Sequence, residues 1–184
     1  MGVDRLAGVL RAARQGDEWA IGILFRELQP LLLRYLRRQA PLVAEDLASE
    51  TWLGVARQLP SFAGSVAEFR ALLFTIARRR VADHYRAQGR RPSVRPLEHA
   101  DEPPGGEDPG EAVVGKLSAQ QAIDQLVGAL PPAQAEVVLL RVVAGLSVEE
   151  TATVIGRSPG AVRVLQHRAL RRLSEAVESD RVTP

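Results

Sequence analysis

Apolar residues recur every three or four positions along most of the chain, which is the spacing of one face of an α-helix. The sequence shows neither the strict alternation of a half-buried strand nor an Asn-Gly pair that would close a hairpin. The pattern therefore predicts an all-α protein. In the N-terminal half it predicts four helices, at about 4–15, 17–39, 44–59 and 67–88, and Pro30 can kink the second.

The helix predicted at 67–88 has an apolar side and a strongly basic end. The side expected to pack in the core consists of Phe69, Leu72, Leu73, Ile76 and Ala77. Its last turns carry Arg78, Arg79, Arg80 and Arg86. Cations near a helix C-terminus stabilise it by roughly 0.3–1 kcal/mol each, so part of this charge needs no ligand.

Two helix starts follow each other closely near the C-terminus. Ser147 and Glu150 form the pattern of a capping box, which predicts a short helix at 148–155. Gly156 fits the position after that helix, where a positive φ is needed, and Ser158 with Pro159 begins a second helix that runs to about Leu173.

The second of these helices has one apolar and one basic face. Val162, Leu165, Ala169 and Leu173 share the apolar stripe, whereas Arg163, Val164, His167, Arg168 and Arg171 point away from it. A tight pair of helices with a basic outer face is the pattern of a helix-turn-helix motif. A plain corner between two helices, with solvated arginines, is the structural alternative.

Charge divides the chain into three parts. Residues 60–96 contain eight arginines and two acids, whereas 97–115 contain six acids and no Lys or Arg, with several Pro and Gly. Such a segment buries too little apolar surface to fold, so we predict a flexible acidic linker at 92–116. It would join two small helical domains at 1–91 and 117–184.

Composition excludes several kinds of chemistry. There is no cysteine, and the three histidines are far apart in sequence, so we expect no disulfide, no metal site and no cofactor. No apolar run reaches the roughly 18 residues of a membrane span, and no signal-peptide core opens the chain, which predicts a cytoplasmic protein without a membrane span.

An acidic patch lies on the helix predicted at 44–59. Asp46, Ser49 and Glu50 share one side of that helix, next to Trp52 and Leu53. A solvated face over a core tryptophan is the ordinary interpretation of such a patch. Because no histidine or metal set accompanies the acids, we predict no catalytic residue and no enzymatic activity.

Several stretches in a fixed order resemble the extracytoplasmic-function sigma factors (ECF, group IV) of bacterial RNA polymerase, within the sigma-70 family. The resemblance rests on ARQGDEWAIGILFREL, LLLRYLRR, AEDLASETWLGVARQLPSF, FRALLFTIARRRVADHYR and LPPAQAEVVLLRVVAGLSVEETATVIGRSPGAVRVLQHRALRRL. These stretches cover roughly residues 8–91 and 117–175. The resemblance implies that the first domain is sigma region 2 and the second is the helix-turn-helix of sigma region 4.

The resemblance also implies three binding surfaces. The surface for core polymerase would comprise Asp46, Leu47, Ser49 and Glu50. The surface for the minus-ten element, where a flipped base is captured and phosphates are held, would comprise Phe62, Ala63, Gly64, Ser65, Glu68, Arg78, Arg79 and Arg86. The surface for the minus-thirty-five element, read from the major groove, would comprise Ser158, Gly160, Arg163, Val164, His167 and Arg171.

The resulting hypothesis is an alternative sigma factor. It would bind core RNA polymerase, recognise both promoter elements, help to melt the start site and be held inactive by an anti-sigma factor. Two other functions stay open at this point: a free-standing dimeric helix-turn-helix regulator and a small all-α enzyme. One departure from the family is Gln166, a polar residue near the apolar side of the second helix of the motif, where leucine is common in relatives.

Overall fold

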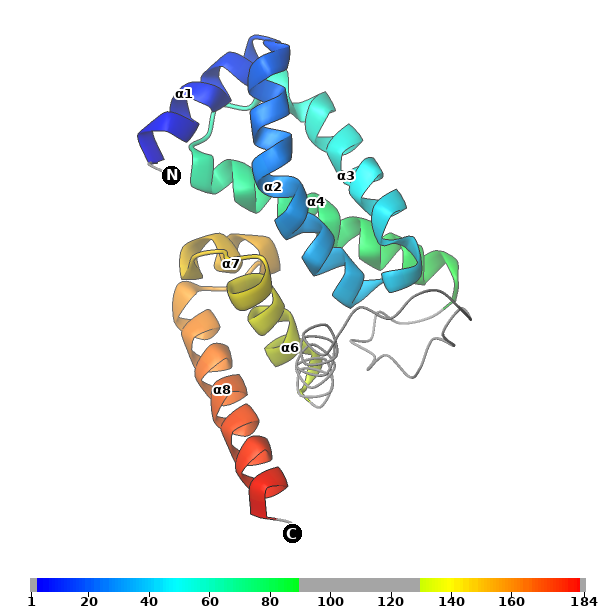
Figure 1. Cartoon of the computed structure of the whole chain (residues 1–184), viewed down its shortest axis with the longest axis vertical. Helices are drawn as coiled ribbons and strands as arrows, with labels where there is room; N and C mark the ends of the chain where they lie inside the picture. Colours follow the sequence, from blue (N-terminus) through cyan, green and yellow to red (C-terminus); the bar gives the residue numbers. More distant parts are fainter. Residues whose placement is uncertain (1–2, 90–129, 183–184) are drawn as a thin grey trace, which may run out of the picture.

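The computed structural model describes residues 3–89 and 130–182, and every regular element in these two ranges is a helix (Figure 1). The α-helices are α1 (Val3–Arg14), α2 (Glu18–Gln39), α3 (Ala44–Gln58), α4 (Val66–Ala87), α6 (Pro132–Val138), α7 (Val148–Ile155) and α8 (Pro159–Val182). Two 3-10 turns, η1 (Pro41–Val43) and η2 (Leu59–Ser61), and a π-helical turn, η3 (Leu139–Val143), complete them. The all-α prediction is confirmed.

The N-terminal bundle consists of α1–α4 and is organised around α2. Leu24, Leu28, Leu32 and Leu36 recur every fourth residue and are at most 3% exposed, so one stripe of α2 faces the core along its whole length. The helix continues through Pro30. Close to its end the Tyr35 ring meets Phe74 of α4 edge-on, with 5.5 Å between ring centroids.

The C-terminal bundle consists of α6, η3, α7 and α8. It has a small hydrophobic cluster of its own, formed by Val137, Ala152 and Val162. Helices α7 and α8 make the helix-turn-helix. Ser147 and Glu150 make both hydrogen bonds of the predicted capping box, and Gly156 ends α7 with φ at 66°. Helix α8 extends beyond Leu173 to Val182, farther than predicted, because neither glycine nor proline interrupts 174–182.

The two bundles share one hydrophobic core. Helix α4 packs against α7, and η3 packs against α2. Leu139, Leu146 and Val154 belong to the same buried cluster as Phe74 and Leu36. Figure 1 shows the C-terminal bundle lying directly under the N-terminal one, with α8 extending away toward the C-terminus.

This docking explains what the sequence pattern of α4 missed. Phe69, Leu73 and Ala77 are buried as predicted, and Leu72 and Ile76 are partly buried. Ala71 and Phe74, outside the predicted face, are also buried, because α4 is covered from more than one side. The predicted linker at 92–116 lies outside the described residues.

Candidate nucleic-acid interface

The acidic patch of α3 lies on the surface, with one exception. Asp46, Ser49 and Glu50 are exposed, and Glu50 lies 3.7 Å from the Arg80 guanidinium of α4. Leu47 is only 5% exposed and belongs to the core. It therefore lies beneath the patch, where it can hold α3 in place but offers little surface to a partner.

Aromatic and aliphatic side chains continue this patch: Trp52 and Leu53, which the sequence placed beside it, and Phe25, which sequence reasoning missed. The Trp52 ring packs on Phe25 of α2 with 5.2 Å between centroids, and Trp52 Nε1 donates to Gln29 Oε1 at 2.6 Å. Phe25 is 43% exposed and Leu53 is 59% exposed. Exposed apolar groups next to acids form a surface suited to a protein partner. The only sequence signal for this surface was that Phe25 is apolar although it lies off the buried stripe of α2. Hydrophobic periodicity alone would place such a residue in the core.

The loop between η2 and α4 is held in one shape by close contacts. The Phe62 ring packs edge-on against Phe69 at 5.7 Å, and Arg14 donates to the Phe62 carbonyl at 2.8 Å. A Cβ atom on Gly64 would lie 2.6 Å from the Phe62 ring and 3.0 Å from Glu68 Cβ. Any side chain at this position would therefore have to push the Phe62 ring away.

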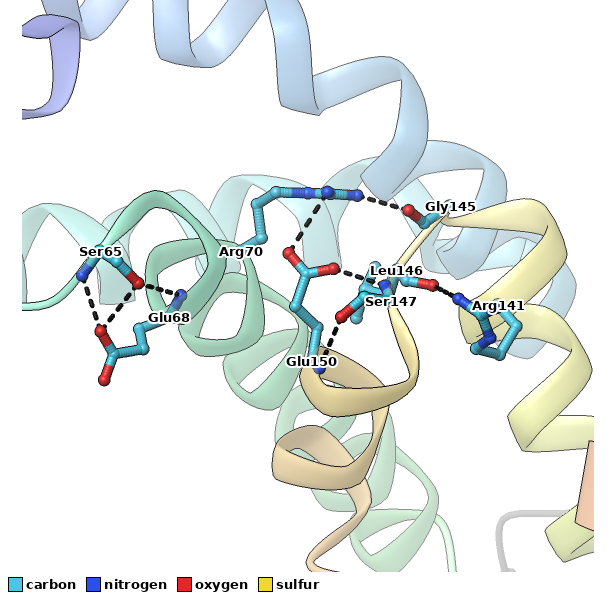
Figure 2. Close-up of polar contacts among 8 residues, drawn as sticks. All are labelled: Ser65, Glu68, Arg70, Arg141, Gly145, Leu146, Ser147 and Glu150. Atoms are coloured by element: carbon cyan, nitrogen blue, oxygen red, sulfur yellow. Dashed lines mark hydrogen bonds and ion pairs between the residues drawn. The ribbon is translucent and has the colours of Figure 1, made fainter. Parts of the chain in front are cut away.

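Glu68 caps the start of α4 (Figure 2). Its carboxylate accepts hydrogen bonds from the Ser65 backbone N–H and the Ser65 hydroxyl, both at 2.8 Å, and the Ser65 hydroxyl accepts from the Glu68 backbone N–H. The hydrogen bond from the Ser65 backbone, followed by that from its hydroxyl, lowers the pKa of Glu68. Glu68 is therefore an anion with a structural role, and Ala63 and Ser65 are exposed beside it.

Most of the arginines on α4 already have acidic partners. Arg86 pairs with Asp83 at 2.6 Å, and Arg78 pairs with Glu136 of α6 at 2.5 Å. Hydrogen bonding to Glu136 raises the pKa of Arg78. Arg79 is exposed, and among the side chains described at 6–89 and 130–175 none forms an ion pair with it. A phosphate could therefore reach Arg79 directly, whereas at Arg78 it would compete with a carboxylate.

The predicted outer face of α8 is exposed. The exposed fractions are 63% for the Arg163 side chain, 50% for Val164 and 74% for the Arg171 side chain, and His167 is exposed as well. Arg163 pairs with Glu149 of α7 at 3.2 Å and Arg171 with Glu175 at 2.9 Å, both on the surface. Exposed pairs of this kind contribute little to stability, so a stronger anion can replace the carboxylate.

The first turn of α8 already contains a hydrogen bond that caps the helix. The Ser158 hydroxyl accepts from the Ala161 backbone N–H at 3.2 Å. Gly160 is exposed, and the nearest atom to a Cβ added there would be the Ser158 Oγ at 3.9 Å. Gly160 is therefore not needed for space within the chain.

Gln166 is a polar link inside the helix-turn-helix. Its side-chain oxygen accepts from Arg141 Nε at 3.1 Å, and the same guanidinium donates to the Leu146 carbonyl (the latter bond is shown in Figure 2). The guanidinium thus ties α8 to the turn before α7. Arg141 and Gln166 are 25 positions apart, so no local pattern indicated the pair.

Neither a metal-binding cluster nor a membrane-spanning helix occurs in the part of the chain that the structure describes. No cluster of three or more His, Asp or Glu side chains there could hold a metal ion. Among the same residues, no helix is long and apolar enough to cross a membrane.

Comparison with known proteins covers most of the chain. The model of sigma-70 region 2 matches residues 24–91, and that of sigma-70 region 4 matches residues 120–173. The ECF RNA polymerase sigma factor SigD of Mycobacterium tuberculosis is 36% identical over 180 residues, which are 95% of this chain and 84% of SigD. The ECF RNA polymerase sigma factor ShbA of Streptomyces griseus is 37% identical over 183 residues, 94% of this chain and 95% of ShbA.

A solved structure has the same fold. CnrH, determined in complex with the cytosolic domain of CnrY, superposes with a TM-score of 0.67 at 24% identity, over 94% of this chain and 96% of that one. At this identity the likeness supports the arrangement of helices alone.

Proposed function

This chain belongs to the extracytoplasmic-function sigma factors of RNA polymerase, and we propose that three of its surfaces divide the work of promoter recognition. As a sigma factor it binds core RNA polymerase and promoter DNA to initiate transcription. The proposal assigns residues 1–91 to polymerase binding and the minus-ten element, 92–116 to a linker, and 117–184 to the minus-thirty-five element. The observation that carries it is the exposed basic face of α8, set on a capped helix-turn-helix.

The minus-thirty-five surface is the outer face of α8. Arg163 and His167 are one helical turn apart on the exposed side, and an α-helix of this width fits the major groove. Guanidinium groups donate in a fork that matches guanine, so Arg163 is assigned to a base edge. Arg171 lies two turns farther along, and we assign it to a phosphate.

The minus-ten surface comprises the loop at Phe62–Ser65 and the basic side of α4. The loop leaves no free space for a side chain at Gly64. Its shape is held by the packing of Phe62 on Phe69 and by the hydrogen bond from Ser65 to Glu68. A preformed loop beside Arg79 and Arg86 can accept an unstacked base while arginines hold the neighbouring phosphates.

The polymerase surface comprises the exposed acids of α3 and the apolar groups beside them. Asp46 and Glu50 provide negative charge, and Phe25, Trp52 and Leu53 provide exposed apolar area. Charge complementarity with basic groups would speed the encounter with the polymerase, and burial of the rings would hold the complex.

Membership in the sigma-factor family also supports proposals on how this chain is regulated and where it acts. We propose that a separate anti-sigma protein controls this chain, since CnrH was solved with the cytosolic domain of CnrY. We propose further that the chain acts in the cytoplasm, where the polymerase is, and that it has no enzymatic activity of its own.

Run-off transcription tests the function. Purified core polymerase, with and without this chain, would be supplied with fragments of the source genome. We expect new discrete start sites that share two spaced upstream elements. Stable dimers that bind palindromic duplex without polymerase, together with an absence of new transcripts, would instead support the free-standing regulator.

A further inference from the structure

A carboxylate lies beside the arginine that is assigned to a base edge. Glu149, in the first turn of α7, accepts a hydrogen bond from Arg163 Nη2 of α8 at 3.2 Å. The exposed fractions of the two side chains are 66% for Glu149 and 63% for Arg163, so the pair lies at the surface proposed to face DNA. Because DNA phosphates repel an acid, this carboxylate weakens the binding of every DNA sequence.

The backbone that carries Glu149 is fixed by the start of α7. Ser147 and Glu150 close the first turn of the helix with the two hydrogen bonds of the capping box (Figure 2). The Glu150 carboxylate is only 5% exposed and also lies 3.3 Å from the Arg70 guanidinium. Glu149 therefore meets Arg163 from a fixed backbone, and only its own side-chain torsions are free.

The pair leaves Arg163 able to read a base. A guanidinium carries several N–H donors in a planar fork, and the bond to Glu149 occupies only one of them. A parallel pair of N–H groups stays available on another edge of the fork, and guanine offers O6 and N7 to such a pair. The carboxylate and a guanine can therefore share one guanidinium.

A phosphate on the same guanidinium is less favourable. It would lie close to the Glu149 carboxylate, and the two anions repel each other, whereas a guanine is neutral. A free arginine on this surface would bind a phosphate readily, and such a contact carries no sequence information. Glu149 thus biases Arg163 toward the kind of contact that distinguishes sequences.

We propose that Glu149 is a positioning residue for base selection, whose carboxylate holds the Arg163 guanidinium toward a base edge and away from phosphates. Glu149 contacts no base itself and acts through Arg163. The carboxylate lowers the affinity for all DNA and increases the difference between preferred and other sequences. The inference rests on the proposed function, because it requires Arg163 to read the minus-thirty-five element.

Binding of the holoenzyme to matched duplexes measures this role. The probes are a promoter duplex identified by run-off transcription, the same duplex with each single-base-pair substitution in its upstream element, and one with that element scrambled. Glu149→Gln keeps the shape of the side chain and removes its charge. We expect tighter binding of the scrambled duplex, and roughly two- to fivefold less discrimination at the base pair that Arg163 selects. The thermal unfolding midpoint should stay close to that of the wild type, because an exposed pair adds little stability.

Two further variants separate positioning from a general effect of charge. Glu175→Gln removes an equal charge 2.9 Å from Arg171, which is assigned to a phosphate, so it should tighten binding of all the duplexes without changing discrimination. In the Arg163→Ala background, Glu149→Gln should no longer change discrimination, because the side chain through which it acts is absent.

Three results would overturn the inference and leave the proposed function intact, provided that Arg163→Ala alone relaxes selection at one base pair. They are unchanged discrimination in Glu149→Gln, an equal loss of discrimination in Glu175→Gln, and a loss that persists in the Arg163→Ala background. If Arg163→Ala changes no base preference, the role of Arg163 in the proposed function fails, and the inference fails with it.

Discussion

At the scale of single residues, we predict that the outer face of α8 separates base reading from phosphate binding. Arg163→Ala should relax selection at one base pair of the upstream element, at a cost of roughly 1–3 kcal/mol on the preferred sequence. Arg171→Ala should weaken binding on all sequences and lower the salt dependence. Binding of the holoenzyme to a set of single-base promoter variants measures both. Equal losses on every promoter from both changes would contradict this division.

Hydrogen bonds from Ser65 lower the pKa of Glu68, which lies beside the loop proposed to bind the minus-ten element. Its pKa lies below the ordinary value of 4.5 because Ser65 donates two hydrogen bonds to the carboxylate. The capping box therefore contributes fully above that ordinary value and is lost as the pH falls through the lowered pKa. A carboxyl titration followed by NMR should show this shift, and Ser65→Ala should remove most of it. An unshifted Glu68 would mean that the cap does not form in solution.

At the scale of elements, the link between Arg141 and Gln166 ties α8 to the turn before α7. Gln166→Ala should leave the partly buried guanidinium without this acceptor and cost about 1 kcal/mol in the free energy of unfolding. Chemical denaturation measures the cost, and Gln15→Ala, an exposed change just after α1, is the control. A loss no larger than that of the control would show that the apolar contacts alone hold the motif.

The acidic patch on α3 is the surface that we expect to bind core polymerase. Reversing the charge with Asp46→Lys and Glu50→Lys should weaken binding of core polymerase at least tenfold, about 1.4 kcal/mol, while helicity measured by circular dichroism stays unchanged. Arg80 would lose its neighbour Glu50, but that exposed pair contributes little. Unchanged polymerase binding would return the patch to an ordinary solvated surface.

At the scale of the whole molecule, local signals predicted the elements and not their docking. The capping box of Ser147 and Glu150 starts α7, and Gly156 ends it, through backbone geometry within a few residues. The sequence therefore reveals where α7 ends and α8 begins. The burial of Phe74, the Arg70–Glu150 pair and the aromatic surface at Phe25 depend on residues far away in the chain. Such contacts follow from how helices meet in space, and a periodic pattern on one helix carries no information about them.

The spacing between the two promoter elements tests the central claim most directly. If one chain reads both elements with separate bundles, transcription must depend on their separation and on the face of the DNA. Adding about five base pairs, half a helical turn, places the upstream element on the opposite side of the duplex. We expect run-off transcription to fall to background with this insertion and to change little when one base pair is added. Equal transcription at both spacings would contradict the account, because the C-terminal bundle would then contribute nothing to promoter choice.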